Sequence, residues 1–332
     1  MAAKVKDGVL LYVDEQIDAL RQHVPAALTQ FDEKGVHQAR VATRRLKAAL
    51  DLLAEPAGAE AFGPLNRAGR KLRRLLGPLR DADVMIKNAE AYVAADRHKP
   101  ALAWLTGVLR ADRDRLRGQD AKKAKPVDKR LKPFDAWWSQ RRAIEPQLAG
   151  IEPAIVARLA AQAEAFARDA DALAGAGLDA VAARPTPLDV HDLRIDGKAL
   201  RYTFELAQAH GVNVPKRVFK SFKAMQEALG EWHDFVVLAE TTARCWTDKQ
   251  LALHDPSLAE GVLGLVKLFL KDATKALGTF KSRWKRSGHG VLEVVARLQP
   301  TAPSPAAAVV IEPQTVLRPL PLDAPSDPAE PA

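Results

Sequence analysis

The sequence predicts an all-α protein on three grounds. Alanine, leucine, arginine, lysine, glutamate and glutamine, which have the highest helix propensities, dominate the body of the chain. Apolar residues recur at helical spacing, as Val9, Val13, Ile17 and Leu20 do near the N-terminus, and β-branched residues are sparse. Hydrophobic residues make up 47% of the 332 residues, which is enough to bury a core and suggests about two domain-sized units.

Glycine and proline divide the helical periodicity into segments. Gly77 and Pro78 predict the end of one helix and the start of the next, with Asp81 in the first turn of the new helix. The basic stretch 122–126 and the connector 175–187 are expected to be loops. The predicted helices span 5–31, 36–54, 59–76, 78–97, 100–118, 128–149, 153–174, 188–210, 215–229, 231–253 and 257–282, with a weaker segment at 290–298.

The C-terminal segment 299–332 is predicted to be a disordered tail, because it holds nine of the 22 prolines and has no helical periodicity. The whole chain carries a net charge of +9 and the tail contributes −3, which leaves +12 on residues 1–298. A body this basic indicates an anionic partner, such as nucleic acid, an anionic membrane surface or another polyanion.

Cysteine content and hydropathy restrict the class of protein. Cys245 is the one cysteine, so the chain forms neither an intramolecular disulfide nor a cysteine-based zinc site. We find no signal peptide and no apolar run of about 18 residues that could span a membrane. We therefore expect a cytoplasmic protein without a membrane span, a metal or a cofactor.

Two blocks of sequence occur twice, in the same order. Residues 37–50 resemble residues 191–204 at an offset of 154, and Leu76-Gly77-x-x-x-Asp81 resembles Leu229-Gly230-x-x-x-Asp234 at an offset of 153. Two ordered blocks at nearly the same spacing indicate a tandem duplication of a helical unit. The expected units are residues 1–150 and 151–298, followed by the tail.

The first block places a histidine and three cations on one face of a helix. Positions 37, 40, 44 and 47 fall within an arc of roughly 80°, while Leu46, Leu50 and Leu53 lie on the opposite side. Like charges repel at this spacing, and no acid lies between residues 37 and 47. Phosphate would supply the missing negative charge, because arginine binds it bidentately and lysine as a point charge. The first stripe is His37, Arg40, Arg44 and Lys47, and the second stripe is His191, Arg194, Lys198 and Arg201.

Further cations extend these stripes. Arg45 belongs to the first motif, and a neighbouring helix places several cations on one face, with counterparts in the second unit. These additional candidates are Arg67, Arg70, Lys71 and Arg74, then Lys216, Lys220 and Lys223. The alternative for the stripes is a solvated helix face, and the alternative for the histidines is a structural role at a helix N-terminus. Asp81 and Asp234 are expected to face the helix dipole or to pair with an arginine.

The duplicated motifs resemble the CHAD domain, the conserved histidine α-helical domain, over roughly residues 5–290. The resemblance implies two four-helix bundles related by a pseudo-twofold axis, with a basic surface or channel between them. It also implies inorganic polyphosphate as ligand, association with polyphosphate granules, and the cations named above as binders. Two departures occur in the second copy, where Lys198 stands opposite Arg44 and Ala199 stands opposite Arg45.

Three functions compete at this stage. The duplicated stripes favour a non-catalytic polyphosphate-binding module. The +12 body favours a non-specific nucleic-acid-binding protein, in which nucleic acid would compete with polyphosphate. An enzyme acting on phosphoanhydrides would use His37 or His191 with Asp81 or Asp234. This last hypothesis has little support, because we find no P-loop, no Arg-His-Gly signature, no carboxylate cluster with metal spacing and no Glu-x-Glu-x-Lys signature of a triphosphate-tunnel domain.

Overall fold

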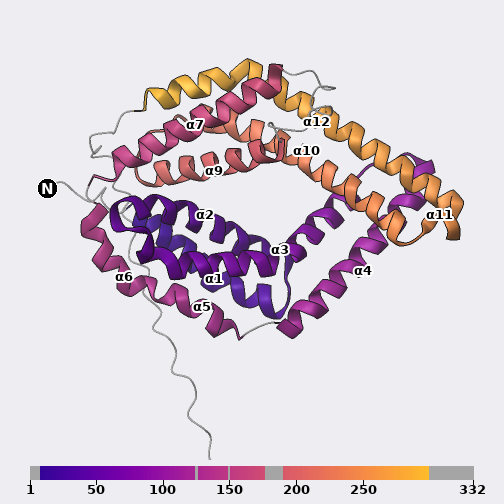
Figure 1. The fold of residues 1–332 in the computed structure, drawn as a ribbon, viewed down its shortest axis with the longest axis horizontal. Helices are drawn as coiled ribbons and strands as arrows, with labels where there is room; N and C mark the ends of the chain where they lie inside the picture. Colours follow the sequence, from indigo (N-terminus) through magenta and orange to yellow (C-terminus); the bar gives the residue numbers. More distant parts are fainter. Residues whose placement is uncertain (1–7, 124–125, 149, 176–189, 299–332) are drawn as a thin grey trace, which may run out of the picture.

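The computed structural model describes residues 8–123, 126–148, 150–175 and 190–298. Every regular element in these ranges is a helix, which confirms the predicted all-α class (Figure 1). The predicted tail 299–332 and most of the connector 175–187 lie outside these ranges. The helices are α1 (Gly8–Thr29), α2 (Glu33–Ala57), η1 (Ala59–Phe62), α3 (Gly63–Ala91), η2 (Asp96–His98), α4 (Lys99–Lys123), α5 (Val127–Asp135), α6 (Trp137–Ile144), η3 (Glu145–Leu148), α7 (Glu152–Gly175), α9 (Val190–Ala209), α10 (Lys216–Asp248), α11 (Leu251–His254) and α12 (Pro256–Ala296).

Helix α3 runs unbroken through Gly77 and Pro78, so the predicted helix end there is wrong. A proline inside a helix removes one backbone hydrogen bond and costs about 3 kcal/mol. Leu76 and Leu79 on either side are each 1% exposed. Burying each leucine contributes about 1.5–3 kcal/mol, which offsets the cost of the proline and holds both segments on one axis.

Helices α10 and α12 also continue where the sequence predicts gaps, at Gly230 and over residues 283–289. Gly230 lies inside α10 between the buried Leu229 and Leu238, and a single helical glycine costs only about 1 kcal/mol. Gly288 lies inside α12, where a Cβ atom would approach the indole ring of Trp284 to 2.5 Å. The absence of a side chain at Gly288 therefore makes room for a buried tryptophan.

The apolar faces of the helices form two separate cores. The larger core joins α1, α2 and the start of α3 to α7, α9, the start of α10 and the end of α12. The smaller core joins the far end of α3 and α4 to the far end of α10, α11 and the start of α12. Both cores thus contain residues from before and after position 150. The pseudo-twofold relation and the division near residue 150 stay predictions.

Local signals fix where the first stripe lies. The Asp32 carboxylate accepts a hydrogen bond of 2.6 Å from the Gly35 backbone N–H and caps α2 at its N-terminus. Leu46, Leu50 and Leu53 are at most 1% exposed, as their helical spacing predicts. Their burial against α1 and α3 turns the opposite face of α2, which carries the first stripe, away from the core.

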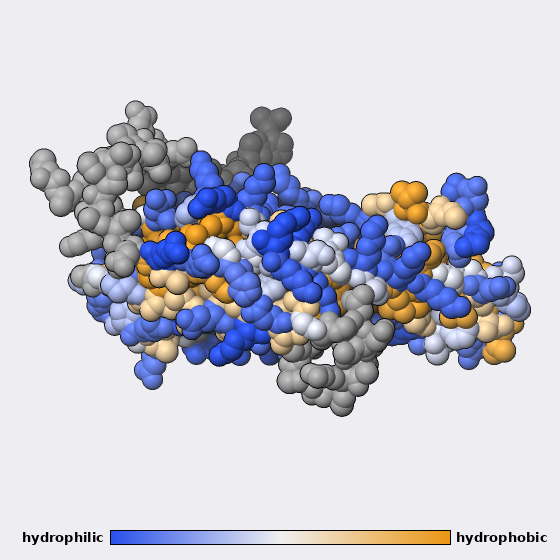
Figure 2. Space-filling view, turned by 90° about the horizontal axis from the view of Figure 1, so that it is seen from above, coloured by the Kyte–Doolittle hydropathy of each residue, from blue (hydrophilic) through white to orange (hydrophobic). Residues whose placement is uncertain are grey.

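The molecular surface is mainly polar. Figure 2 shows hydrophilic residues over most of the visible face, with apolar residues in patches among them. Among the described residues, no helix combines the length and the apolar character that a membrane span requires.

Candidate functional site

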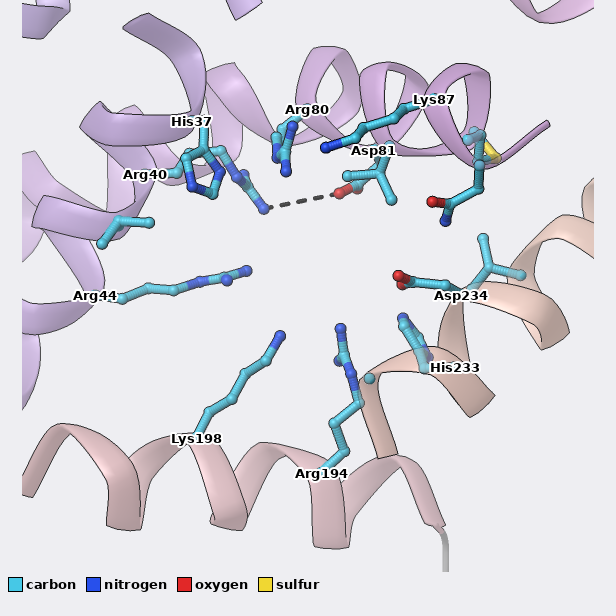
Figure 3. A pocket seen from close by; sticks show the side chains of 16 residues that line it. His37, Arg40, Arg44, Arg80, Asp81, Lys87, Arg194, Lys198, His233 and Asp234 are labelled. Carbon is cyan, nitrogen blue, oxygen red and sulfur yellow. Dashed lines mark ion pairs between the residues drawn. The ribbon is translucent and has the colours of Figure 1, made fainter. Parts of the chain in front are cut away.

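A pocket of about 480 Å³ lies where α2, α3, α9 and α10 meet, and we call it the central pocket (Figure 3). The first stripe contributes from α2 and the second stripe from α9, while the two Leu-Gly-x-x-x-Asp blocks contribute from α3 and α10. Both copies of both duplicated motifs therefore reach one space. Its lining is His37, Arg40, Val41, Arg44, Arg80, Asp81, Val84, Met85, Lys87, Asn88, Arg194, Lys198, Gly230, His233, Asp234 and Val237.

Charge in the central pocket is unbalanced. Six cationic side chains line it, but only two carboxylates do, those of Asp81 and Asp234. Figure 3 shows the cationic ends pointing from both sides toward the open middle of the pocket. The surplus of positive charge makes this pocket suited to an anion that carries several negative charges.

Arg40 is held in place by helix α3. Its Nη1 donates a hydrogen bond of 2.7 Å to the backbone carbonyl of Arg73, and its Nη2 lies 3.8 Å from the Asp81 carboxylate. A Cβ atom at Gly77 would lie 3.1 Å from Nη1, so the glycine of the Leu-Gly block lets the guanidinium approach the helix. The Asp81 side chain is 68% exposed, so this ion pair neutralises Arg40 weakly.

The second copy is arranged differently. The Nε of Arg194 is buried and has no hydrogen-bond partner among the described residues. Burial, together with the nearby Arg194 and Arg44, lowers the pKa of Lys198 to about 7, although Asp234 opposes the shift. Burial raises the pKa of Asp234, which Arg194 and a hydrogen bond with Asn88 counteract. An anion in the pocket would satisfy the orphaned Nε and stabilise the charged form of Lys198.

The two histidines of the stripes occupy different places. His37 lines the pocket, and burial and the cations Arg80 and Arg44 lower its pKa, which favours the neutral imidazole. His191 lies beside the pocket rather than in its lining, and its Nδ1 is 3.4 Å from Nδ1 of His233, which does line it. His233 belongs to the second Leu-Gly block, three residues after Gly230. It lines the central pocket, whereas the second stripe predicts that His191 does so.

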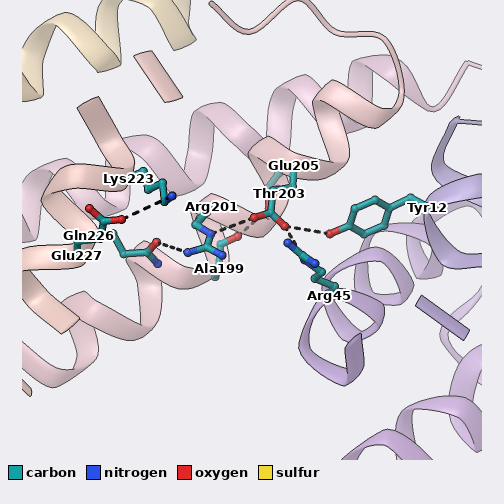
Figure 4. Close-up of polar contacts among 9 residues, drawn as sticks. All are labelled: Tyr12, Arg45, Ala199, Arg201, Thr203, Glu205, Lys223, Gln226 and Glu227. Carbon is teal, nitrogen blue, oxygen red and sulfur yellow. Dashed lines mark hydrogen bonds and ion pairs between the residues drawn. The ribbon is translucent and has the colours of Figure 1, made fainter. Parts of the chain in front are cut away.

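Three further cations of the two motifs, Arg45, Lys47 and Arg201, lie outside the central pocket and are paired with acids of the protein. The Glu205 carboxylate accepts a hydrogen bond of 2.8 Å from Nε of Arg45 and one of 3.0 Å from Nε of Arg201 (Figure 4). The Tyr12 hydroxyl donates to the same carboxylate at 3.5 Å, and both burial and Glu205 raise the pKa of Tyr12. Glu205 thus joins α1, α2 and α9. Lys47 pairs with Asp51 one turn along its own helix.

The remaining predicted cations lie outside the central pocket. Arg67 and Lys71 line a second pocket at the start of α3. Arg70 and Arg74 are exposed on the same helix. The three predicted cations of α10 are exposed near its N-terminus, and they are Lys216, Lys220 and Lys223. Lys223 forms an ion pair of 3.7 Å with Glu227.

Sequence patterns did not identify Arg80 and Lys87 as candidates, yet both line the central pocket. Arg80 lies next to Asp81 in the first Leu-Gly block. The repeated block therefore indicated this position, although only Asp81 was considered as a functional residue there. Lys87 lies two turns further along, beyond the predicted helix break at Gly77, and only the unbroken α3 brings it to the pocket.

The chemistry that this lining supports is the binding of an anion. Guanidinium and ammonium groups from four helices can bind several phosphate oxygens at once. Within the described ranges, no group of three or more histidine, cysteine or acidic residues has an arrangement that could hold a metal ion. The aromatic rings on which nucleic-acid bases would stack are missing from the lining of the central pocket, where the only rings are imidazoles.

Comparisons with known proteins agree with this architecture. A family model described as the CHAD domain matches residues 11–243, a range that includes every residue of the central pocket. The crystal structure of the CHAD domain from the plant Ricinus communis has a TM-score of 0.56 and 20% sequence identity, over 90% of this chain and 93% of that one. PptA from Streptomyces chartreusis has a TM-score of 0.53 and 15% identity, over 84% and 99%. These two structures support the fold. No curated protein matches the sequence.

Proposed function

The chain belongs to the CHAD domain family, and from this premise and the central pocket we propose that it binds inorganic polyphosphate without cleaving it. The observation that carries the proposal is the convergence of six cations, from both halves of the duplicated sequence, on a pocket of about 480 Å³ that holds only two carboxylates. Polyphosphate carries a negative charge at every unit. Unlike nucleic acid, it has no bases or sugars that a binding site would have to contact. A cationic pocket without phenylalanine, tyrosine or tryptophan in its lining fits that chemistry.

The test removes two cations of the central pocket that have no ion pair among the described residues. Arg44→Gln/Lys198→Gln takes one cation from each stripe. We expect the affinity for long-chain polyphosphate to fall about 100-fold, because each hydrogen bond to a charged group contributes about 1.5 kcal/mol or more. The matched control, Lys267→Gln/Lys271→Gln, removes the same charge from exposed positions of α12 and should lose less than about threefold, as surface charges do.

Salt dependence gives a second measure of the same variants. Binding to a polyanion releases counterions, and on duplex DNA the slope of log K against log salt is about −0.9 for each phosphate neutralised. The double substitution in the pocket should make the slope for polyphosphate shallower by about one to two. Equal affinities and slopes for the pocket variant and the control would refute the proposal.

Two further assays separate the alternatives. Duplex DNA or RNA that displaces polyphosphate at equal phosphate concentration would favour the nucleic-acid function that the basic body suggests. Incubation with polyphosphate and Mg²⁺ should release no phosphate. Release that His37→Ala abolishes would show an enzyme instead of a binding module.

The proposal extends to location in the cell. A protein that binds polyphosphate chains should collect at polyphosphate granules. A fluorescent fusion of the unaltered chain should coincide with the granules, whereas the Arg44→Gln/Lys198→Gln fusion should be dispersed at equal expression. Coincidence that survives the double substitution would mean that another surface directs the protein there.

A further inference from the structure

A second pocket, of about 400 Å³, lies between the first turns of α3 and helix α5, and we call it the α3–α5 pocket. Its lining combines apolar residues with cations. Four of its eight lining residues are cations and none is an acid. The lining is Pro64, Arg67, Ala68, Lys71, Leu72, Lys129, Arg130 and Pro133. The sequence patterns drew attention to the cations of α3 but not to those of α5.

The cations of the α3–α5 pocket are not neutralised by the described parts of the protein. None of the four takes part in an ion pair with a described residue. The Nε of Arg130 is buried and lacks a hydrogen-bond partner among the same residues. A buried donor without an acceptor costs free energy, so an external acceptor at this place would be bound favourably. Arg194 in the central pocket has the same unpartnered Nε.

One face of α3 connects the two pockets. At about 100° per residue, Arg67, Arg70 and Arg74 share an arc of roughly 60° with Asp81 and Asn88 of the central pocket. Arg70 and Arg74 are exposed. Because a helix rises about 1.5 Å per residue, Arg67 lies about 20 Å along the axis from the first residues of α3 that line the central pocket.

We propose that the α3–α5 pocket is a second binding site for the same phosphate chain, which leaves the central pocket and follows the exposed arginines of α3. This inference rests on the proposed function, since it assigns a further stretch of the same ligand. A short phosphate chain fills the central pocket alone, whereas a long chain occupies both pockets. Once one end is held, the local concentration of the rest of the chain favours the second contact, so affinity rises with chain length.

The test compares two ligands on the full chain. Lys129→Gln/Arg130→Gln removes the cations of α5, and Arg67→Gln/Lys71→Gln removes those of α3 from the same pocket. Each variant should lose about tenfold or more in affinity for long-chain polyphosphate and less than about twofold for tripolyphosphate at its tightest site. Lys267→Gln/Lys271→Gln, with the same loss of charge, should lose less than about threefold for long chains and equally little for tripolyphosphate.

The outcomes are distinguishable. Unchanged affinity for long chains in both variants, with thermal melts like that of the unaltered protein, would overturn the second site and leave the central pocket intact. Equal losses for tripolyphosphate and long chains would also overturn it, because the two pockets would then not be separate. Failure of the unaltered protein to bind either ligand would instead refute the proposed function.

Discussion

The abnormal pKa of Lys198 predicts that polyphosphate affinity depends on pH in a particular direction. In the free protein this pKa lies at about 7, mainly through burial and then through Arg194 and Arg44. A phosphate beside the ammonium favours its charged form and raises the pKa toward its ordinary value of about 10.4. Between these two values the complex holds one more proton than the free protein. Raising the pH therefore weakens binding.

The size of the effect follows from the two pKa values. If the pKa of Lys198 in the complex reaches its ordinary value, affinity falls about 50-fold between pH 7 and pH 9, which corresponds to about 2 kcal/mol. Below about pH 6 the lysine is charged in both the free protein and the complex, and its contribution to the slope disappears. His37 lines the same pocket, so any change in its protonation on binding is common to the unaltered protein and to a variant that alters Lys198 alone.

The assay is a titration of affinity for long-chain polyphosphate at constant ionic strength, from pH 7 to pH 9. Lys198→Arg is the matched control, because guanidinium keeps its charge throughout this range. The terminal phosphates of the ligand titrate identically with both proteins, so the difference between the two curves belongs to Lys198. Identical slopes for the unaltered protein and Lys198→Arg would refute the reasoning.

Three further predictions concern stability and geometry. Gly77→Ala should weaken polyphosphate binding severalfold by pushing the guanidinium of Arg40 off α3; Gly107→Ala in α4, which lies outside the central pocket and whose Cβ meets nothing within 4 Å, should leave binding unchanged and raise the melting temperature, since Ala is favoured over Gly in a helix by about 1 kcal/mol. Glu205→Gln should lower the unfolding free energy by about 2 kcal/mol in urea denaturation, because two guanidiniums lose their carboxylate; no change would mean that water replaces it without cost. Lys198→Met should stabilise the ligand-free protein by up to about 4 kcal/mol at pH 6, where the desolvated ammonium is charged, and by about 1 kcal/mol near pH 10, where the lysine is largely neutral in the folded and partly neutral in the unfolded protein. A smaller gain at pH 6 than at pH 10 would contradict the assigned pKa.

The sequence determined what depends on neighbours along the chain. Helical periodicity placed Leu46 and Leu50 in the core and the first stripe on the opposite face of the same helix. The repeated blocks, whose offsets differ by one residue, indicated that two equivalent sets of side chains exist. Both results follow from the fixed rotation of about 100° per residue, which any reader of the sequence can apply without knowing how the helices pack.

The tertiary structure decided which cations are available to a ligand. Arg44 and Arg45 are adjacent in the sequence, yet Arg44 points into the central pocket while Arg45 is neutralised by Glu205 of α9, 160 residues away. Arg80 and Lys87 joined the pocket only because α3 continues through Pro78. A helix face is set by local geometry, whereas the partner of a charge is set by the helix that packs against it. That pairing depends on burial and distance between segments remote in the chain, which periodicity does not encode.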